Sequence, residues 1–345
     1  MTNVKENQHK SRNTSSCLVI GGGISGLIAS HVLQRNGLDA TILDKGRGIG
    51  GRLATRRVNF PEHGQGIFDY GVQNFSATDT EFKKLVDIWI QDGLVVQWSN
   101  VIYTAEGNFQ NSEEILYRGV KSNRNIAKYL AKDLDIRTQT RIVDLQWSSG
   151  QWIANSHQGD SFQGDTLLVT APVPQSLELL NNSDIKIPLE MQTNLEKLAY
   201  HRCIAVLAFL DKPSQIPETG GLRLDREPLA WIGCNYKKGI SPEAYAVTLH
   251  ASSEFSLANW DADRDIVAQQ LIDVAQHWLG SKVVKYQVHG WKFSQPITSY
   301  GQPYAVLKKP GTLVLAGDTF SSQKNLEGAV LSGLAAAEFI VDSQD

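Results

Sequence analysis

The chain has 345 residues, of which 41% are hydrophobic and 20% are charged, and these values are typical of a folded globular protein. A net charge of −3 gives no reason to expect binding to nucleic acid, and no apolar run approaches the roughly 20 residues that a membrane helix needs. The three cysteines form no CxxC pair and the histidines have no ligand-like spacing, so neither a disulfide framework nor a metal site is expected, and a reducing cytoplasmic compartment is the simplest location.

The chain begins with a polar segment. Residues 1–16 are rich in Lys, Asn and Ser, and they predict a flexible tail. The apolar stretch that follows, residues 17–29, is interrupted by three consecutive glycines, so it is better explained as part of the fold than as a signal peptide. A targeting role for the tail stays open.

The next 30 residues have the pattern of a strand–helix–strand unit. Residues 17–20 form a short apolar run without polar alternation, which predicts a strand buried on both faces of a parallel sheet. Residues 27–36 predict a helix, and Gly37 stands where a helix C-terminal cap belongs. A second strand is expected over residues 40–43, so the whole segment predicts a βαβ unit.

The turn inside this unit carries a dinucleotide-binding pattern. Gly21 allows the tight turn, Gly23 lets the main chain approach a pyrophosphate, and Gly26 lets the helix pack closely on the strand. The helix N-terminus offers free N–H groups to the phosphates, and Asp44 after the second strand is placed to accept hydrogen bonds from a ribose. The residues expected to bind the dinucleotide here are Gly21, Gly23, Ile24, Ser25, Gly26 and Asp44.

A second glycine-rich turn follows at residues 48–52. Arg52 supplies a planar donor group suited to phosphate, so this turn is expected on the far side of the pyrophosphate. Cofactor contacts are therefore expected from Lys45, Gly50, Gly51 and Arg52. Arg47, Arg56 and Arg57 extend the positive region, although for Lys45 and Arg47 a solvated basic loop explains the pattern equally well.

Further elements are expected along the rest of the chain. The predicted helices cover residues 81–91, 123–134, 263–279 and 326–341. Strands are expected over residues 203–210, 245–251 and 312–316, and a meander of strands over residues 141–147, 151–156 and 166–170. These elements suggest a discontinuous nucleotide-binding domain over residues 17–75, 120–175 and 290–345, and a substrate domain over residues 76–119 and 176–289.

Motifs at both ends of the chain resemble a known family. The runs at residues 44–56 and 68–75 resemble the renalase branch of the flavin amine oxidase superfamily, and the second is similar to its D-x-G-x-Q-x-F segment. Residues 315–318 and 326–333 resemble the closing flavin-binding motif of the superfamily. The resemblance implies an α/β fold of the glutathione-reductase type, with a Rossmann-type FAD-binding domain and a smaller α+β substrate domain.

The resemblance also implies a cofactor and its contacts. Asp318 after Gly317 is expected to hydrogen-bond the ribityl chain of FAD, and Val143 to meet the adenine. A helix starting near Leu326 and Glu327 would direct its N–H groups at the flavin ring, where its dipole favours the reduced anion. No cysteine follows Cys234, so FAD is expected to be bound non-covalently.

The substrate is inferred from the resemblance alone. Renalase-like enzymes oxidise 2- and 6-dihydro isomers of NAD(P)H, and dioxygen is the usual oxidant in the family, with hydrogen peroxide as the product. The residues expected to contact such a small donor are Gln73, Phe75, Trp291, Lys292 and Tyr300. A placement of Trp291 in the core and of Lys292 on the surface is an equal alternative, and His63 and His289 are weaker candidates for proton transfer.

Three other functions stay open at this point. An amine oxidase would use paired aromatic rings beside the flavin, which Tyr300 and Tyr304 could supply. A flavin-binding sensor would hold FAD without rapid reduction by small donors. An NAD-dependent dehydrogenase would be colourless after purification.

Overall fold

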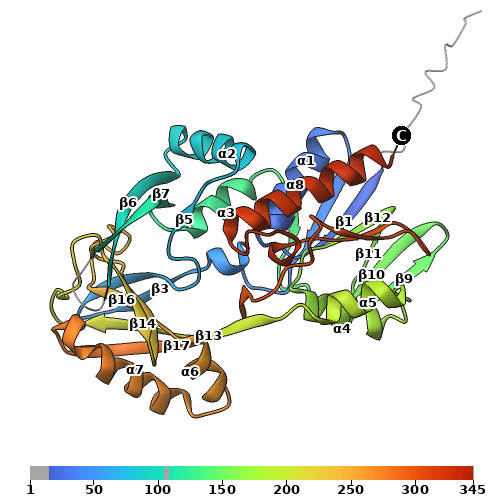
Figure 1. The fold of residues 1–345 in the computed structure, drawn as a ribbon. Helices are drawn as coiled ribbons and strands as arrows, with labels where there is room; N and C mark the ends of the chain where they lie inside the picture. Colours follow the sequence, from blue (N-terminus) through green and yellow to red (C-terminus); the bar gives the residue numbers. More distant parts are fainter. Residues whose placement is uncertain (1–14, 105–108, 345) are drawn as a thin grey trace, which may run out of the picture.

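A computed structural model describes residues 15–104 and 109–344, and the predicted tail lies outside this part except for its last two residues. Two large sheets stand at opposite ends of the molecule, and β13, a long strand of the second sheet, extends towards the first (Figure 1). Within these described ranges, no helix is both long and apolar enough to span a membrane.

The first sheet has six strands in the order β18-β19-β12-β1-β2-β8 and contains the predicted βαβ unit. Its strands are β1 (Ser16–Ile20), β2 (Asp39–Leu43), β8 (Asp135–Arg137), β12 (Thr166–Val169), β18 (Ala305–Leu307) and β19 (Leu313–Leu315). The central strands run parallel, and only β18 is antiparallel to its neighbour. Side chains of β1 alternate between two separate cores, which confirms a strand buried on both faces.

Helices cover one face of this sheet and a small meander with two helices covers the other (Figure 1). On the first face are α1 (Ile24–Arg35), α2 (Thr80–Gln91), α3 (Arg124–Leu130) and α8 (Leu326–Asp342). On the second face are β9 (Ile142–Ser148), β10 (Gln151–Ser156), β11 (Ser161–Gly164), α4 (Val173–Asn182) and α5 (Leu189–Glu196).

The second large sheet has eight strands in the order β17-β13-β16-β15-β14-β6-β7-β5. Its strands are β5 (Phe75–Ser76), β6 (Val95–Thr104), β7 (Phe109–Gly119), β13 (Tyr200–Leu210), β14 (Gly221–Arg226), β15 (Leu229–Cys234), β16 (Ala246–Ala251) and β17 (Val283–Pro296). One face packs on α6 (Ser253–Ala258) and α7 (Arg264–Leu279). The hairpin of β3 (Thr55–Phe60) and β4 (Gly64–Asp69) packs on β13 and β16 through Phe68 and Phe209.

The predicted fold class is confirmed, and so are most predicted elements, with two corrections. The helix expected over residues 123–134 ends at Leu130, and the chain then turns through Asp133, whose φ is +65°. Residues 166–169 belong to the parallel sheet between β1 and β19, while β11 supplies the third strand of the meander. All four residues of this strand are buried, and three of them are apolar, which fits a strand covered on both faces.

The cores do not follow the expected domain boundaries closely. Phe82, Val86 and Trp89 of α2 lie in the same hydrophobic cluster as Leu27 of α1 and Ala337 of α8. Helix α2 was expected in the substrate domain, but its apolar side packs on the helices of the six-stranded sheet. The division into two domains stays a prediction.

Candidate active site

A cavity of about 1280 Å³ is lined by residues of both large sheets. We call one part the glycine-turn end, which is lined by residues 20–21, 23–25, 43–53 and 140–143. The other part is the sheet end, which is lined by Arg56, residues 70–75, Arg223, Trp231, His250 and residues 289–293. Segments from the beginning, middle and end of the chain therefore meet around one space.

The glycine turn leads directly into α1. Gly21 has a φ of +116°, a conformation that side chains rarely adopt. A Cβ atom at Gly26 would lie 2.1 Å from the carbonyl oxygen of Gly21, so this glycine is required for close packing and does not line the cavity. A Cβ atom at Gly23 would meet no protein atom within 4 Å, so nothing in the protein itself requires glycine there.

The N-terminus of α1 has no side-chain cap and no acidic residue in its first turn. Its first N–H groups therefore need an outside partner, and a phosphate group is the chemical species that best matches them. Ile24 and Ser25 line the cavity at this point. The uncapped helix and the open space at Gly23 together fit the pyrophosphate of a dinucleotide.

Asp44 organises the turns beside it. One carboxylate oxygen accepts a hydrogen bond from the N–H of Gly22 at 2.6 Å, and the other accepts one from the N–H of Gly46 at 2.6 Å. Each carboxylate oxygen has more than one lone pair, so both can still accept from a ribose hydroxyl. Lys45 donates to Gln175 at 2.9 Å, and Val143 lines the cavity nearby.

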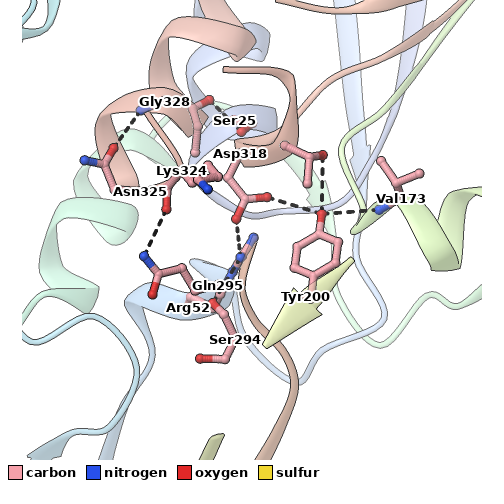
Figure 2. Close-up of polar contacts among 12 residues, drawn as sticks. Ser25, Arg52, Val173, Tyr200, Ser294, Gln295, Asp318, Lys324, Asn325 and Gly328 are labelled. Carbon is pink, nitrogen blue, oxygen red and sulfur yellow. Dashed lines mark hydrogen bonds and ion pairs between the residues drawn. The ribbon is translucent and has the colours of Figure 1, made fainter. Parts of the chain in front are cut away.

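Arg52 forms an ion pair with Asp318, which follows β19 near the other end of the chain (Figure 2). The same guanidinium nitrogen lies 3.3 Å from the carbonyl oxygen of Ser294, and the Tyr200 hydroxyl lies 3.4 Å from Asp318. The sequence assigned Arg52 to phosphate and Asp318 to ribityl, whereas the structure joins the two. Gly50, Gly51, Gly317 and both partners of the pair line the cavity.

The N-terminus of α8 also points at the cavity. The side chain of Asn325 caps this helix by accepting a hydrogen bond from the N–H of Gly328 at 3.0 Å (Figure 2). The Ser25 hydroxyl donates to the carbonyl oxygen of Ala329 at 2.6 Å, which joins the start of α1 to the start of α8. Two helix N-termini separated by about 300 residues of sequence thus open on one site.

Besides Gly26, two of the predicted site residues, Glu327 and Tyr300, do not line the cavity. Glu327 is buried, and it accepts hydrogen bonds from the main-chain N–H groups of Thr78 at 2.7 Å and Asp79 at 2.5 Å. Its carboxylate therefore anchors the segment before α2, while Leu326 beside it does reach the cavity. Tyr300 packs on Phe320 with ring centroids 5.2 Å apart, in the second hydrophobic cluster.

The other predicted donor contacts meet at the sheet end. Trp291 stacks on Tyr70 with ring centroids 5.3 Å apart, and its indole N–H donates to the Tyr70 carbonyl oxygen at 2.9 Å. Lys292, Gln73 and Phe75 also line this part of the cavity. Gln73 is fixed from inside, since its amide nitrogen donates to the Asp69 carbonyl oxygen at 2.6 Å. Of the weaker candidates, His289 lines the cavity and His63 stacks on Phe60 away from it.

Sequence reasoning missed Arg223, Trp231 and His250, and it assigned Arg56 to the pyrophosphate side. The strand pairing explains these side chains, because Arg223 is paired with Trp231, and Trp231 with His250. His250 and His289 are both paired with Ala205 of β13, so one row across five strands faces the cavity. Residues in such a row are far apart in the sequence, and their strands carried no motif to reveal them.

Both imidazoles of this row are neutral at physiological pH. Burial lowers the pKa of His250 to about 4, and its Nε2 lies 2.9 Å from the Tyr70 carbonyl oxygen. Burial and the nearby Arg56 guanidinium lower the pKa of His289 to about 4. Within residues 15–104 and 109–344, no three His, Cys, Asp or Glu side chains are grouped to hold a metal ion.

Comparison with known proteins gives consistent results. Residues 19–89 match the NAD(P)-binding Rossmann-like domain, and residues 96–341 match the flavin containing amine oxidoreductase family. Renalase from Mus musculus is 23% identical over 345 aligned residues, which cover 94% of this chain and 98% of that protein.

Solved structures share the fold. A protein provisionally named protoporphyrinogen oxidase, from Exiguobacterium sp. 255-15, superposes with a TM-score of 0.69 at 14% identity, covering 96% of this chain and 98% of the other. A triple mutant of putrescine oxidase, redesigned in its cofactor binding, gives a TM-score of 0.67 at 10% identity, covering 96% and 98%. Because the family match spans most of the chain, this chain belongs to the flavin-containing amine oxidoreductases, as a renalase-like, flavin-dependent oxidoreductase.

Proposed function

We propose that this chain is an FAD-dependent oxidase whose electron donor is an isomeric dihydronicotinamide nucleotide, with the hydride on carbon 2 or 6 of the ring. Dioxygen is the electron acceptor, and hydrogen peroxide is the second product. The observation that carries the choice of donor is the charge of the sheet end. Its charged side chains are Arg56, Arg223 and Lys292, all cationic.

Among the described residues, none with a carboxylate side chain lines this part of the cavity. The Asp and Glu side chains among the described residues that line the cavity are Asp44, Glu178 and Asp318. Asp44 belongs to the glycine-turn end, Glu178 lies on α4, and Asp318 is paired with Arg52. A protonated amine would meet only like charge at the sheet end, whereas the phosphates of a dinucleotide would be attracted by it.

The neutral and aromatic side chains fit the same donor. Tyr70 and Trp291 form a flat stacked pair, and such a surface suits a nicotinamide ring. A dihydronicotinamide donates hydride without first losing a proton, so the site needs no general base. The low pKa values of His250 and His289 leave both imidazoles neutral, so they serve as hydrogen-bonding groups.

The glycine-turn end supports FAD as the cofactor. It would be held by the main-chain N–H groups at the start of α1, by the Asp44 carboxylate and by the segment around Val143. When bound, a flavin accepts the hydride and is re-oxidised by dioxygen. A cavity of about 1280 Å³ exceeds the roughly 300–1,000 Å³ of an ordinary ligand site, which leaves room for a donor beside the cofactor.

The proposal is tested by mixing the purified yellow protein with candidate donors without oxygen. We expect 2- and 6-dihydroNAD, the isomers of NADH, to bleach the flavin band within seconds, and ordinary NADH and putrescine to bleach it far more slowly. Peroxide should then appear on admission of air, and the flavin released by heating should be FAD. Rapid bleaching by putrescine alone would overturn the choice of donor.

Charge variants separate donor binding from cofactor binding. Arg56→Ala and Arg223→Ala should each raise the Kd for the donor about tenfold, because a charged hydrogen bond contributes about 1.5–3 kcal/mol. Arg202→Ala is the matched control, since Arg202 stacks on Trp260 with its guanidinium carbon 4.9 Å from the ring centroid and does not line the cavity. FAD affinity should be unchanged in all three variants.

A further inference from the structure

The segment of residues 69–73 begins at the last residue of β4 and continues as irregular chain towards β5, and its residues 70–73 line the cavity. Each of its carbonyl groups is hydrogen-bonded. Side chains donate to each of them. The carbonyl oxygen of Asp69 accepts from Gln73 and Thr248, and that of Tyr70 is hydrogen-bonded to His250 and Trp291. The carbonyl oxygen of Gly71 accepts from Gln73, that of Val72 from Asn123, and that of Gln73 from Lys238. The carbonyl groups of this segment are thus held partly by Gln73 of the segment itself and partly by side chains from several other elements.

Lys238 is the unusual donor among them. It lies in the turn after β15 and is 2% exposed, and its ammonium group donates to the Gln73 carbonyl oxygen at 2.7 Å. It also lies 5.3 Å from the centroid of the Trp98 ring. A buried ammonium group costs stability unless strong partners compensate it, so its presence here calls for a reason beyond packing.

The lysine reaches the sheet end through two further contacts. Gln73, whose carbonyl oxygen it holds, also accepts a hydrogen bond at its side-chain oxygen from the Trp231 indole at 3.3 Å. Trp231 stands between Arg223 and His250 in the row of side chains that faces the cavity. A displacement of Gln73 would therefore move both the 69–73 wall and the middle of that row.

We propose that Lys238 is a positioning residue, which fixes the cavity wall at residues 69–73 and, through Gln73 and Trp231, the place where the donor ring lies. This inference rests on the proposed function for the identity of the donor. The clamp itself is a property of the protein. Misplacement by about 1 Å at a reacting centre can cost about 100-fold in rate, so a remote clamp of this kind has a measurable effect.

Charged and titratable groups surround Lys238 from several elements. Asp69 faces it from β4, Arg118 from β7, Cys234 from the end of β15 and His250 from β16. Burial lowers the pKa of Lys238 to about 8, with Asp69 opposing this change and Arg118 adding to it. As the pH rises through about 8, the ammonium group loses the charge that strengthens its hydrogen bond to Gln73.

Stability and rate should respond to this titration in opposite directions. The unfolded chain keeps its lysine protonated up to about 10.5, so between about 8 and 10.5 it binds more protons than the folded chain and stability rises with pH. The rate of flavin reduction should instead fall over the same interval, because the clamp weakens. A lysine with a merely structural role would not give this opposition.

The test compares Lys238→Met with wild type in the FAD-loaded protein. We expect faster hydrogen exchange over residues 69–75, a limiting rate of flavin reduction at least tenfold lower, and an FAD affinity within twofold of wild type. The fall in rate above pH 8 should disappear in the variant. Lys237→Met is the matched control, because Lys237 donates to the Ile216 carbonyl oxygen at 2.7 Å and does not line the cavity.

The double variant Asp69→Asn/Lys238→Met covers the case in which the single variant does not fold, because it removes both buried charges together. Unchanged exchange and an unchanged reduction rate in a folded variant would overturn the inference. Loss of FAD from both variants would also overturn it, because the lysine would then be structural. If no dihydronicotinamide reduces the wild type, the proposed function fails. The hydrogen-exchange data and the flavin spectrum then still show whether Lys238 fixes residues 69–73.

Discussion

The two ends of the cavity are built by different means. The glycine-turn end is lined by two glycine-rich turns and by residues 140–143, and it includes the Asp44 carboxylate and the start of α1. The sheet end consists of Arg56, residues 70–75 and a row of side chains that includes Arg223, Trp231 and His250. The strand register aligns this row. Main-chain N–H groups and helix dipoles suit phosphate, which varies little among nucleotides, whereas side chains determine which donor is accepted.

The largest effect is expected from substitutions in the glycine turn. Gly26→Ala brings a Cβ atom to 2.1 Å from the Gly21 carbonyl oxygen, so we expect a loss of several kcal/mol in unfolding free energy and no retained FAD. Gly23→Ala meets no protein atom, so the cofactor-free protein should keep its Tm while its affinity for FAD falls at least tenfold. Thermal melting and FAD titration measure both. A Gly23→Ala variant that binds FAD like wild type would show that no pyrophosphate lies there.

A smaller effect is expected where the two ends meet, at Arg52 and Asp318. Asp318→Ala leaves a half-buried guanidinium group without its carboxylate and should lower the unfolding free energy by about 3 kcal/mol. The double variant Arg52→Ala/Asp318→Ala should lose less than the sum of the two single variants. Urea unfolding measures this coupling. The exposed pair Lys84–Glu81 is the control, and coupling there should stay below about 0.5 kcal/mol. Equal coupling in the two pairs would contradict the prediction.

The smallest effect is a pH dependence confined to the sheet end. The folded pKa values of His250 and His289, about 4, lie below the ordinary 6.5, so between these values the unfolded chain binds more protons than the folded chain. Stability should therefore fall as the pH falls from 6.5 towards 4, and this contribution should vanish above 6.5. Urea midpoints across this range measure it. His250→Gln keeps a donor for Tyr70 and should flatten the slope, and an unchanged slope would exclude His250 as its source.

Much of the fold could be predicted because its signals are local. The strand at residues 17–20, the glycine turn and the helix after it lie within one short stretch, and each follows from residue type and spacing. The helix over residues 123–134 was predicted too long, because the left-handed turn at Asp133 has no strong signal in a non-glycine residue. The strand over residues 166–169 was predicted, but it was assigned to the meander and not to the parallel sheet, because no local pattern indicates which strand pairs with it.

The site divides in the same way. Asp44 and the glycines were found from their spacing. The ion pair of Arg52 with Asp318 and the hydrogen bond of Glu327 to Thr78 appear only in the tertiary structure. The row of Arg223, Trp231 and His250 could not be found, because neighbours across a sheet have no fixed separation along the chain.

What the sequence by itself determined is therefore the glycine turn and its helix, because residue type and spacing encode short-range backbone geometry. Its motifs also predicted the flavin-dependent family to which the chain belongs. What only the tertiary structure decided is the cationic sheet end and the buried clamp around Lys238. Both arise where separate strands and loops pack together. Packing places charged side chains next to each other although they are far apart in the sequence, so no local pattern predicts their contact.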